Sequence, residues 1–245
     1  MKIKSFFYIA FSILISFNSL AQNKERKFKI HTLAFYNLEN LFDTINDVNK
    51  NDEASPIMEI KFNRGNIYKQ KVTNMARVIS EIGYDVTNRP PTIIGICEVE
   101  NRNVVEDLIA NEKLSKYNYG IVHYDSPDRR GIDVGLLYNK DIFKVINSNS
   151  HVLYINYNNT SDRSFTRDQL VVSGKLDGEL IHLIVNHWPS RGADETKRMA
   201  AAEVNNSIID SLRKIHNNPK IITMGDFNDD PFDKSIKKIL GAKKK

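Results

Sequence analysis

The chain has 245 residues, of which 41% are hydrophobic and 27% charged, and it contains a single cysteine. This composition suits one sizeable globular domain and excludes a disulfide-stabilised miniprotein, a collagen and a disordered chain. The net charge of +5 comes from the two ends: without Lys2, Lys4 and the six lysines of residues 234–245, 27 basic side chains face 30 acidic ones, a net charge of −3. The basicity is therefore no sign of a nucleic-acid-binding surface.

The N-terminus has the pattern of a signal peptide. Lys2 and Lys4 precede an apolar stretch at residues 6–17, and the small residues Ser19 and Ala21 fit cleavage after Ala21. The apolar stretch is shorter than the roughly 20 residues that span a bilayer. We expect residues 1–21 to be removed, leaving an exported chain with no transmembrane segment. The alternative is an uncleaved N-terminus that anchors the chain to a membrane.

The predicted elements alternate between strands and helices, with no internal repeat and no interdomain linker. In chain order they are a strand at 28–37, a loop at 43–65, a helix at 67–82, a strand at 92–97, a helix at 103–112, strands at 119–124 and 132–138 around a polar loop at 125–131, short strands at 142–147, 151–155 and 165–176, a strand at 180–186, a helix at 195–216, a strand at 221–224 and a short helix at 232–240. The pattern predicts one domain, residues 22–245, with a mixed α/β sandwich of inner sheets and outer helices.

Four polar segments follow apolar strands, at residues 37–40, 97–101, 186–191 and 225–231. Strand ends are where α/β folds commonly place their sites. In the last segment Asp226 and Asn228 are two residues apart, so a continuing strand would point both side chains the same way, with Phe227 in the core between them. Carboxylate and carboxamide oxygens suit a divalent cation or a phosphoryl group. The alternative is a turn made for local reasons.

Two further polar residues end apolar strands. Glu98 needs a cation or hydrogen-bond partners there, so it is a candidate Mg²⁺ ligand, and its alternative is pairing with an arginine or lysine. His187 precedes Trp188-Pro189, and its alternative is a neutral histidine that caps a core strand. Cys97 lies in a strand of small and apolar residues and is interpreted as a buried packing residue.

Taken together and in this order, the motifs resemble those of the endonuclease/exonuclease/phosphatase superfamily, the group of DNase I. The likeness runs from Phe35 to Pro231 and is closest to secreted bacterial members. It rests on five motifs: Phe35-Tyr36-Asn37-Leu38-Glu39-Asn40-Leu41-Phe42-Asp43, Glu98, Arg130-Gly131-Ile132-Asp133-Val134-Gly135-Leu136-Leu137-Tyr138, Asn186-His187-Trp188-Pro189-Ser190-Arg191 and Gly225-Asp226-Phe227-Asn228.

The resemblance implies a DNase I-like four-layered sandwich with the site on one rim. By that likeness Glu98 is the main metal ligand, with Asn37 beside it. Asp226 orients or deprotonates the attacking water, Asn228 holds the scissile phosphate, and His187 stabilises the phosphate oxygens. The cofactor implied is Mg²⁺, with Mn²⁺ or Ca²⁺ as alternatives.

Three arginines, Arg167, Arg191 and Arg198, are further candidates for phosphate contacts, with a surface role as the alternative for each. Asp133 is expected to make structural hydrogen bonds near the strand ends.

The sequence departs from the family pattern in two places. Cys97 stands where members often have glutamine. No Ser-Asp-His motif follows Asn228, although in the family its Asp and His complete the metal site and the general base. We therefore expect the last strand or strands of the fold to be missing and the chain to be C-terminally incomplete.

The sequence thus predicts an exported bacterial, metal-dependent phosphoester hydrolase, periplasmic or extracellular, acting on a phosphodiester as an endonuclease-like enzyme. Its substrate is a nucleic acid or another phosphoester, and no stable protein partner is indicated. A phosphatase or a sphingomyelinase-like lipid phosphodiesterase is the first alternative. A catalytically impaired chain that acts only by binding is the second, because losing a general base removes orders of magnitude in rate.

Overall fold

The computed structural model describes residues 28–156 and 162–243. By its internal contacts the chain divides into Met1–Ile30 and His31–Lys245, and every element named below belongs to the second unit. The predicted signal peptide lies outside the described residues and stays a prediction. Within those residues, no helix combines the length and apolar character needed to cross a membrane.

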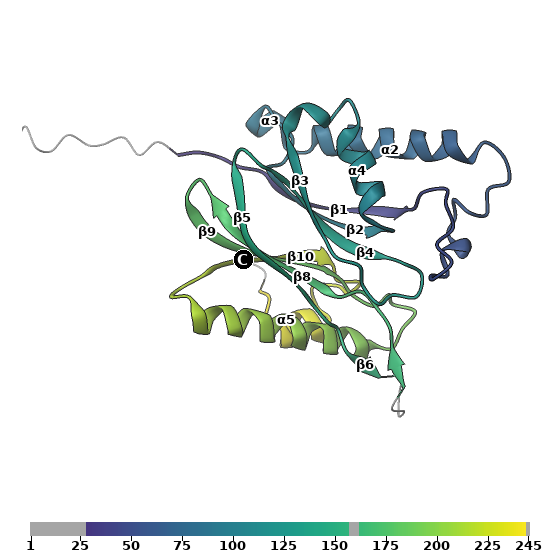
Figure 1. The fold of residues 1–245 in the computed structure, drawn as a ribbon. Coiled ribbons are helices and arrows are strands. Elements are labelled where there is room, and N and C mark those ends of the chain that lie inside the picture. The colour runs from purple at the N-terminus through teal and green to yellow at the C-terminus, as the bar shows by residue number, and fades with distance from the viewer. Residues whose placement is uncertain (1–27, 157–161, 244–245) are drawn as a thin grey trace, which may run out of the picture. The chain divides into compact units, whose positions relative to one another are not determined.

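The first sheet has the strand order β1-β2-β4-β3. Its strands are β1 (Leu33–Leu41), β2 (Ile93–Val99), β4 (Asp133–Asn139) and β3 (Tyr119–His123). Helices α2 (Arg64–Glu81) and α4 (Arg102–Ala110) lie on its outer side (Figure 1). Their buried side chains recur at helical spacing and pack against the sheet; they are Val72, Met75, Ala76, Ile79, Val104, Val105 and Leu108.

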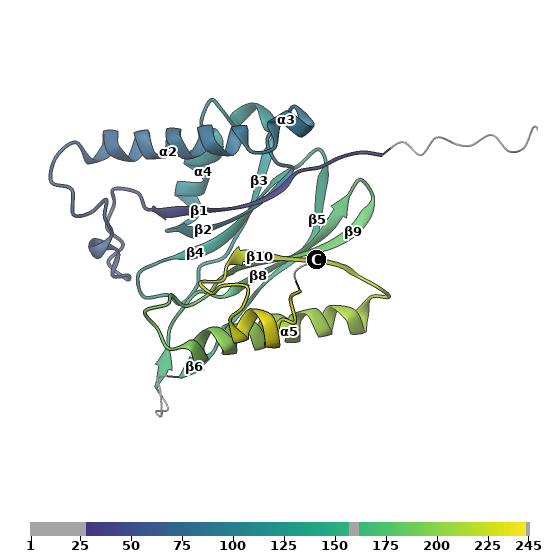
Figure 2. The ribbon, with the colours of Figure 1, turned by 180° about the vertical axis from the view of Figure 1, so that it is seen from behind.

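The second sheet has the strand order β10-β9-β8-β5. Its strands are β10 (Lys220–Asp226), β9 (Glu179–His187), β8 (Gln169–Leu176) and β5 (Phe143–His151). Both views show α5 (Glu195–Ile215) running along the outer side of this sheet (Figures 1 and 2). Asp194 caps α5 by accepting a hydrogen bond from the Thr196 amide.

The inner faces of the two sheets share an apolar core. It contains Ile93, Cys97, Val122, Val134 and Leu136 from the first sheet, and Phe143, Leu170, Val172, Ile181, Leu183 and Val185 from the second. Helices therefore cover both outer faces of a packed pair of sheets. The predicted α/β sandwich is confirmed, and Cys97 is a buried packing residue as expected.

The parallel pairs of strands determine where the site lies. β1 runs parallel to β2 in one sheet, β9 runs parallel to β10 in the other, and both β1 and β2 contact β10 across the sandwich. The polar residues at the ends of these four strands therefore meet at one edge of the sandwich.

Several predicted boundaries were wrong. The first strand begins at Leu33, where its pairing with β2 begins, and it continues through Asn37–Asn40 to Leu41. Instead of separate strands at 142–147 and 151–155, one strand, β5, runs from Phe143 to His151 and pairs with β8 throughout, while residues 152–154 lie in no strand. A register shift near Val145 interrupts the alternation of β5.

Other segments contain only short elements. These are η1 (Asp52–Ala54), α3 (Tyr84–Thr87), η2 (Ser115–Tyr117), the β6–β7 pair (Ile155–Asn156 and Arg163–Ser164) and η3 (Ser235–Ile239). The predicted helix at 232–240 is the single π-helical turn η3, and the predicted strand at 165–176 begins only at Gln169.

Gly225 allows β10 to approach β9 closely. A Cβ atom added at this position would lie 2.3 Å from the carbonyl oxygen of Asn186 and 2.6 Å from its Cβ atom. Because Asn186 is fully buried in β9, these two atoms have little room to move.

We predict that Gly225→Ala lowers the free energy of unfolding by about 1–3 kcal/mol through overpacking. The matched control is Gly65→Ala in α2, where nothing lies within 4 Å of the added atom, and this change should be neutral or stabilising. Urea denaturation of both variants measures the difference. Equal stability of the two variants would contradict the close approach.

Candidate active site

The side chain of Asn37 joins the two central carboxylates. Its Nδ2 donates to Glu98 Oε1 at 2.9 Å and to Asp226 Oδ2 at 3.2 Å. Its Oδ1 accepts from the Glu39 amide at 2.7 Å, which sets the orientation of the carboxamide. Three strands, β1, β2 and β10, thus supply one hydrogen-bonded cluster. In this arrangement Asn37 holds the two carboxylates by its nitrogen, so its predicted role as an oxygen ligand stays a prediction.

Glu98 reaches the cluster through a bulge in β2. It has no partner in the pairing with either neighbouring strand, because the register shifts between Cys97 and Val99 on both sides. Its φ of 59° is unusual for a residue with a side chain, and such bulges re-aim a side chain beside a site. Its second oxygen accepts from the Asn40 amide at 2.9 Å. The alternative of pairing with an arginine or lysine is not seen among the described residues.

Lys71 supports this bulge from the neighbouring helix. Its Nζ donates to the carbonyl oxygens of Glu39 and Asn40, two successive residues that both have positive φ. This contact holds the Asn40 amide on the carboxylate of Glu98. Lys71 could not be predicted from the sequence, because a lysine on an amphipathic helix has the same pattern as any solvent-facing residue.

His187 is buried at the end of β9 beside Glu98. Its Nε2 lies 3.7 Å from Glu98 Oε1, and its Nδ1 is buried with no hydrogen-bond partner. Burial is the main reason that the pKa of His187 is lowered to about 2, and the positive charges of Arg167 and Arg130 add to the effect. The imidazole is therefore neutral at physiological pH, so it can act as a hydrogen-bond donor without carrying a charge.

Strand β10 ends at Asp226, so the predicted alternation from Asp226 to Asn228 was wrong. Asn228 has a φ of 51°, and its amide donates to Asp226 Oδ1 at 3.0 Å, which closes a local turn. The carboxamide of Asn228 donates to the carbonyl oxygen of Trp188 at 3.0 Å. Phe227 packs edge-to-face on Trp188 with a centroid distance of 4.8 Å, in the core as predicted.

The three candidate arginines occupy different environments. Arg191 is exposed and pairs with Asp230 and Asp233, and its Nε donates to the carbonyl oxygen of Asn228. Arg198 is buried against Asp229, where it fixes the loop after β10. Arg167 is also buried, and it alone of the three contributes to the lowered pKa of His187.

The donor atoms at this edge fit a hard divalent cation. Cys97, His187 and Asp226 each place a potential ligand atom within 4.8 Å of the others, and Glu98 adds a carboxylate. Burial, followed by the charges of Glu98 and Asp226, raises the pKa of the Cys97 thiol well above its usual value. A protonated thiol is a poor ligand, so the carboxylate oxygens remain the donors that suit Mg²⁺.

Asp133 makes the structural contacts expected of it. Its Oδ1 accepts from the Ser126 amide at 2.7 Å, and its Oδ2 lies 3.2 Å from Nε2 of His123. These contacts tie the loop at 125–131 to β3 and β4. His123, Asp133 and the exposed Asp125 form a second group of potential ligand atoms, but here the first two are already paired with each other.

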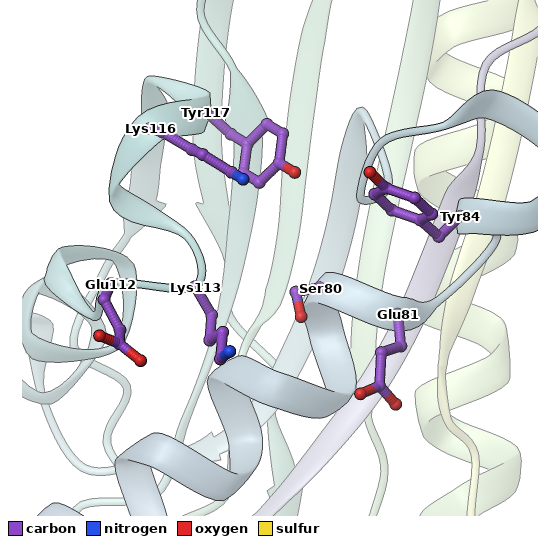
Figure 3. Close-up of a pocket in the computed structure, with 7 residues that line it drawn as sticks. All are labelled: Ser80, Glu81, Tyr84, Glu112, Lys113, Lys116 and Tyr117. Atoms are coloured by element: carbon purple, nitrogen blue, oxygen red, sulfur yellow. The ribbon is translucent and has the colours of Figure 1, made fainter.

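A separate cavity of about 610 Å³ lies at the other end of the first sheet. Figure 3 shows its lining from the end of α2, from α3 and from the segment around η2; the residues are Ser80, Glu81, Tyr84, Glu112, Lys113, Lys116 and Tyr117. Gly83, between α2 and α3, approaches Thr32 before β1, whereas Asn37 follows further along that strand. The charged side chains of this cavity are exposed, and it is separate from the cluster around Glu98.

Residues 32–245 match the model of the Endonuclease/Exonuclease/phosphatase family. The chain belongs to this family. The match covers all four strand-end segments, and the resemblance to this family is thereby confirmed, while the closer likeness to secreted bacterial members stays a prediction. A comparison with curated proteins gave no match.

Solved structures share the fold of this family member. An endonuclease/exonuclease/phosphatase family protein from Bacteroides thetaiotaomicron matches with a TM-score of 0.55 and 17% identity, over 85% of this chain and 66% of that one. The human Nocturnin catalytic domain with bound sulfate has a TM-score of 0.50 and 19% identity, over 68% and 60% of the two chains. A humanized D. rerio TDP2 has a TM-score of 0.50 and 14% identity, over 82% of this chain and 63% of that one. The chain therefore spans about two thirds or less of the length of these structures.

The donor set predicts that Mg²⁺ stabilises the folded chain. At a Mg²⁺ concentration about 100 times the dissociation constant, binding to the folded state alone adds about 2.7 kcal/mol and raises the melting midpoint. Glu98→Gln should abolish the rise, whereas Glu106→Gln, on the exposed side of α4, should retain it. Thermal melting with Mg²⁺ and with EDTA measures both. A rise that survives Glu98→Gln would place the ion elsewhere.

Proposed function

We propose that the chain is a divalent-metal-dependent phosphoester hydrolase that acts on phosphodiesters as an endonuclease-like enzyme. The observation that carries this proposal is the bridging of Glu98 and Asp226 by Asn37, with the neutral His187 beside them. Membership of the family supports phosphoester hydrolysis in general. The two carboxylates and the uncharged donor fit the requirements of phosphodiester cleavage, which are a site for a cation, a positioned water and a donor to the phosphate.

Glu98 would hold the cation, together with oxygen atoms of substrate and water. When bound, a cation such as Mg²⁺ offsets the negative charge that develops on the phosphoryl oxygens. Glu98 is prepared for this role because the Asn37 carboxamide and the Asn40 amide fix both of its oxygens. A ligand held in place in this way loses little conformational entropy on binding.

Asp226 would orient the attacking water and accept its proton. Its two oxygens are held by Nδ2 of Asn37 and the amide of Asn228, and each carboxylate oxygen has a further lone pair for a water molecule. Because the carboxylate is fixed from both sides, the water would have a defined direction of attack.

His187 and Asn228 would donate to the phosphate oxygens. The imidazole is neutral, and its Nε2 lies on the side of Glu98. The Asn228 carboxamide uses one of its two hydrogens on the Trp188 carbonyl, so the other can reach a substrate oxygen. Donors fixed before the reaction stabilise the transition state without having to reorganise.

Hydrolysis of a nitrophenyl phosphodiester tests the proposal. Turnover should need Mg²⁺ and stop with EDTA, and His187→Ala or Asp226→Asn should each lower kcat by roughly 10³-fold. The controls are His151→Ala in β5 and Asp210→Asn on the exposed side of α5, which should keep the wild-type rate. The proposal fails if the folded wild-type protein shows no metal-dependent turnover.

We further propose that the chain is exported. The support is the sequence of residues 1–21, with its two lysines, its apolar stretch and the small residues before Gln22. Expressed with this segment in a Gram-negative bacterium, the mature protein should be recovered from the periplasm or medium with Gln22 as its first residue. N-terminal sequencing checks this, and a mature protein that keeps residues 1–21 would count against cleavage.

A further inference from the structure

A basic pocket lies beside the candidate active site. It has a volume of about 290 Å³, and its lining includes Arg129, Arg130, Thr166, Arg167, Ser190 and Lys197. Arg167 connects the two regions: its Nη2 donates to the Trp188 carbonyl, which also accepts from the carboxamide of Asn228. One carbonyl oxygen therefore anchors a side chain of the site and a side chain of the pocket.

The lining carries an excess of positive charge. Four cationic side chains, those of Arg129, Arg130, Arg167 and Lys197, face a single carboxylate, Asp128. Asp128 pairs with both Arg130 at 3.2 Å and Arg167 at 3.3 Å, so two guanidinium groups share one counter-charge. Such a pocket attracts anions, and guanidinium groups match the geometry of phosphate oxygens.

The other two cations also contact neighbouring side chains of the pocket. Lys197 donates to the Ser164 hydroxyl at 3.2 Å, and Arg129 lies over the ring of Phe165 at 5.3 Å. The positive charge of the pocket also extends to the site, since Arg167 and Arg130 are the charged groups that help to lower the pKa of His187.

Two polar atoms of the pocket are buried without a hydrogen-bond partner. They are Nε of Arg167 and Oγ1 of Thr166, and each residue is only 5% exposed. A buried donor left unpaired costs free energy, so an anion that accepts from these two atoms would gain hydrogen bonds that nothing else in the pocket takes up. Both atoms are donors, and they come from adjacent residues in the lining of one cavity.

We propose that this pocket binds a second phosphate group of the substrate. The inference rests on the proposed function: with the scissile diester at Glu98, Asp226 and His187, the neighbouring phosphate would lie against Arg130, Arg167 and Thr166. The substrate class is then a phosphodiester that carries at least one further phosphate next to the bond that is cleaved. A nucleotide strand meets this description, and a diester with only one phosphate does not.

The binding arm of the test needs no catalysis. Calorimetric titration of the metal-free protein with inorganic pyrophosphate, in EDTA, should show binding that Thr166→Val and Arg130→Gln each weaken about tenfold. Thr166→Val removes a hydroxyl that has no partner, so the variant should remain as stable as the wild type. Arg213→Gln, an exposed arginine near the end of α5, is the matched control and should bind like the wild type. Binding that is unchanged in both pocket variants would overturn the proposal.

The kinetic arm compares two substrates that differ only in the second phosphate. Thymidine 5′-(p-nitrophenyl phosphate) has one phosphate, and its 3′-phosphorylated form has two. The wild type should show a lower KM for the second, and the ratio of the two KM values should fall about tenfold in Arg130→Gln but not in Arg213→Gln.

The two arms separate the two proposals. If the wild type hydrolyses neither substrate, the proposed function fails and the pyrophosphate titration still decides whether the pocket binds phosphate. If it hydrolyses both with equal KM, the site is catalytic and the second subsite is wrong. A KM ratio that Arg130→Gln leaves unchanged would also overturn the subsite.

Discussion

The buried carboxamide of Asn186 ties together the elements behind the site. The residue is fully buried in β9, and its Nδ2 donates to the Thr223 hydroxyl and the Met224 carbonyl of β10. Its Oδ1 accepts from the Trp188 indole and from Asn205 of α5. Asn186, Trp188 and Asn205 are fully buried, so their polar groups need partners inside the protein, and this need restricts the geometry of the network. That geometry sets the position of β10, and therefore of Asp226, relative to His187.

The requirement for Gly225 follows from the same network. β10 comes so close to Asn186 that no side chain fits at position 225. The close approach also brings the Trp188 amide within 2.9 Å of the Asp226 carbonyl, which continues the pairing of the two strands past their ends. The Trp188 carbonyl then points toward Asn228 and Arg167. The candidate catalytic residues and the basic pocket are thus both held by the Trp188 carbonyl. A substitution in the buried network behind it would therefore alter both.

Much of the site could be predicted because its residues lie at the ends of apolar strands. The runs before Asn37, Glu98, His187 and Asp226 are recognisable from composition alone, and parallel pairing brings them to one edge. The alternation of apolar and polar residues could not predict the backbone conformation at that edge. Glu39, Asn40, Glu98 and Asn228 all have positive φ without being glycine, and each makes a hydrogen bond to a residue distant in sequence. Lys71 and the carbonyl of Trp188 make such contacts, and neither has a local sequence pattern that would single it out.

The net charge of the chain likewise does not predict where individual charges lie. A net charge of −3 for the body gives no sign of a broad basic face that would bind a polyanion over much of the surface. At physiological salt concentration, exposed charges interact strongly only within roughly 8 Å. A ligand in a small cavity is therefore affected by the charges of the residues that line the cavity, and hardly by the net charge of the chain. Four cations around Asp128 are therefore compatible with an acidic body. Arg167 and Asp128 are buried, and buried charges are screened least and need a partner of opposite charge or a ligand. A chain with this distribution would discriminate by the position of individual phosphates along a substrate, and less by its total charge.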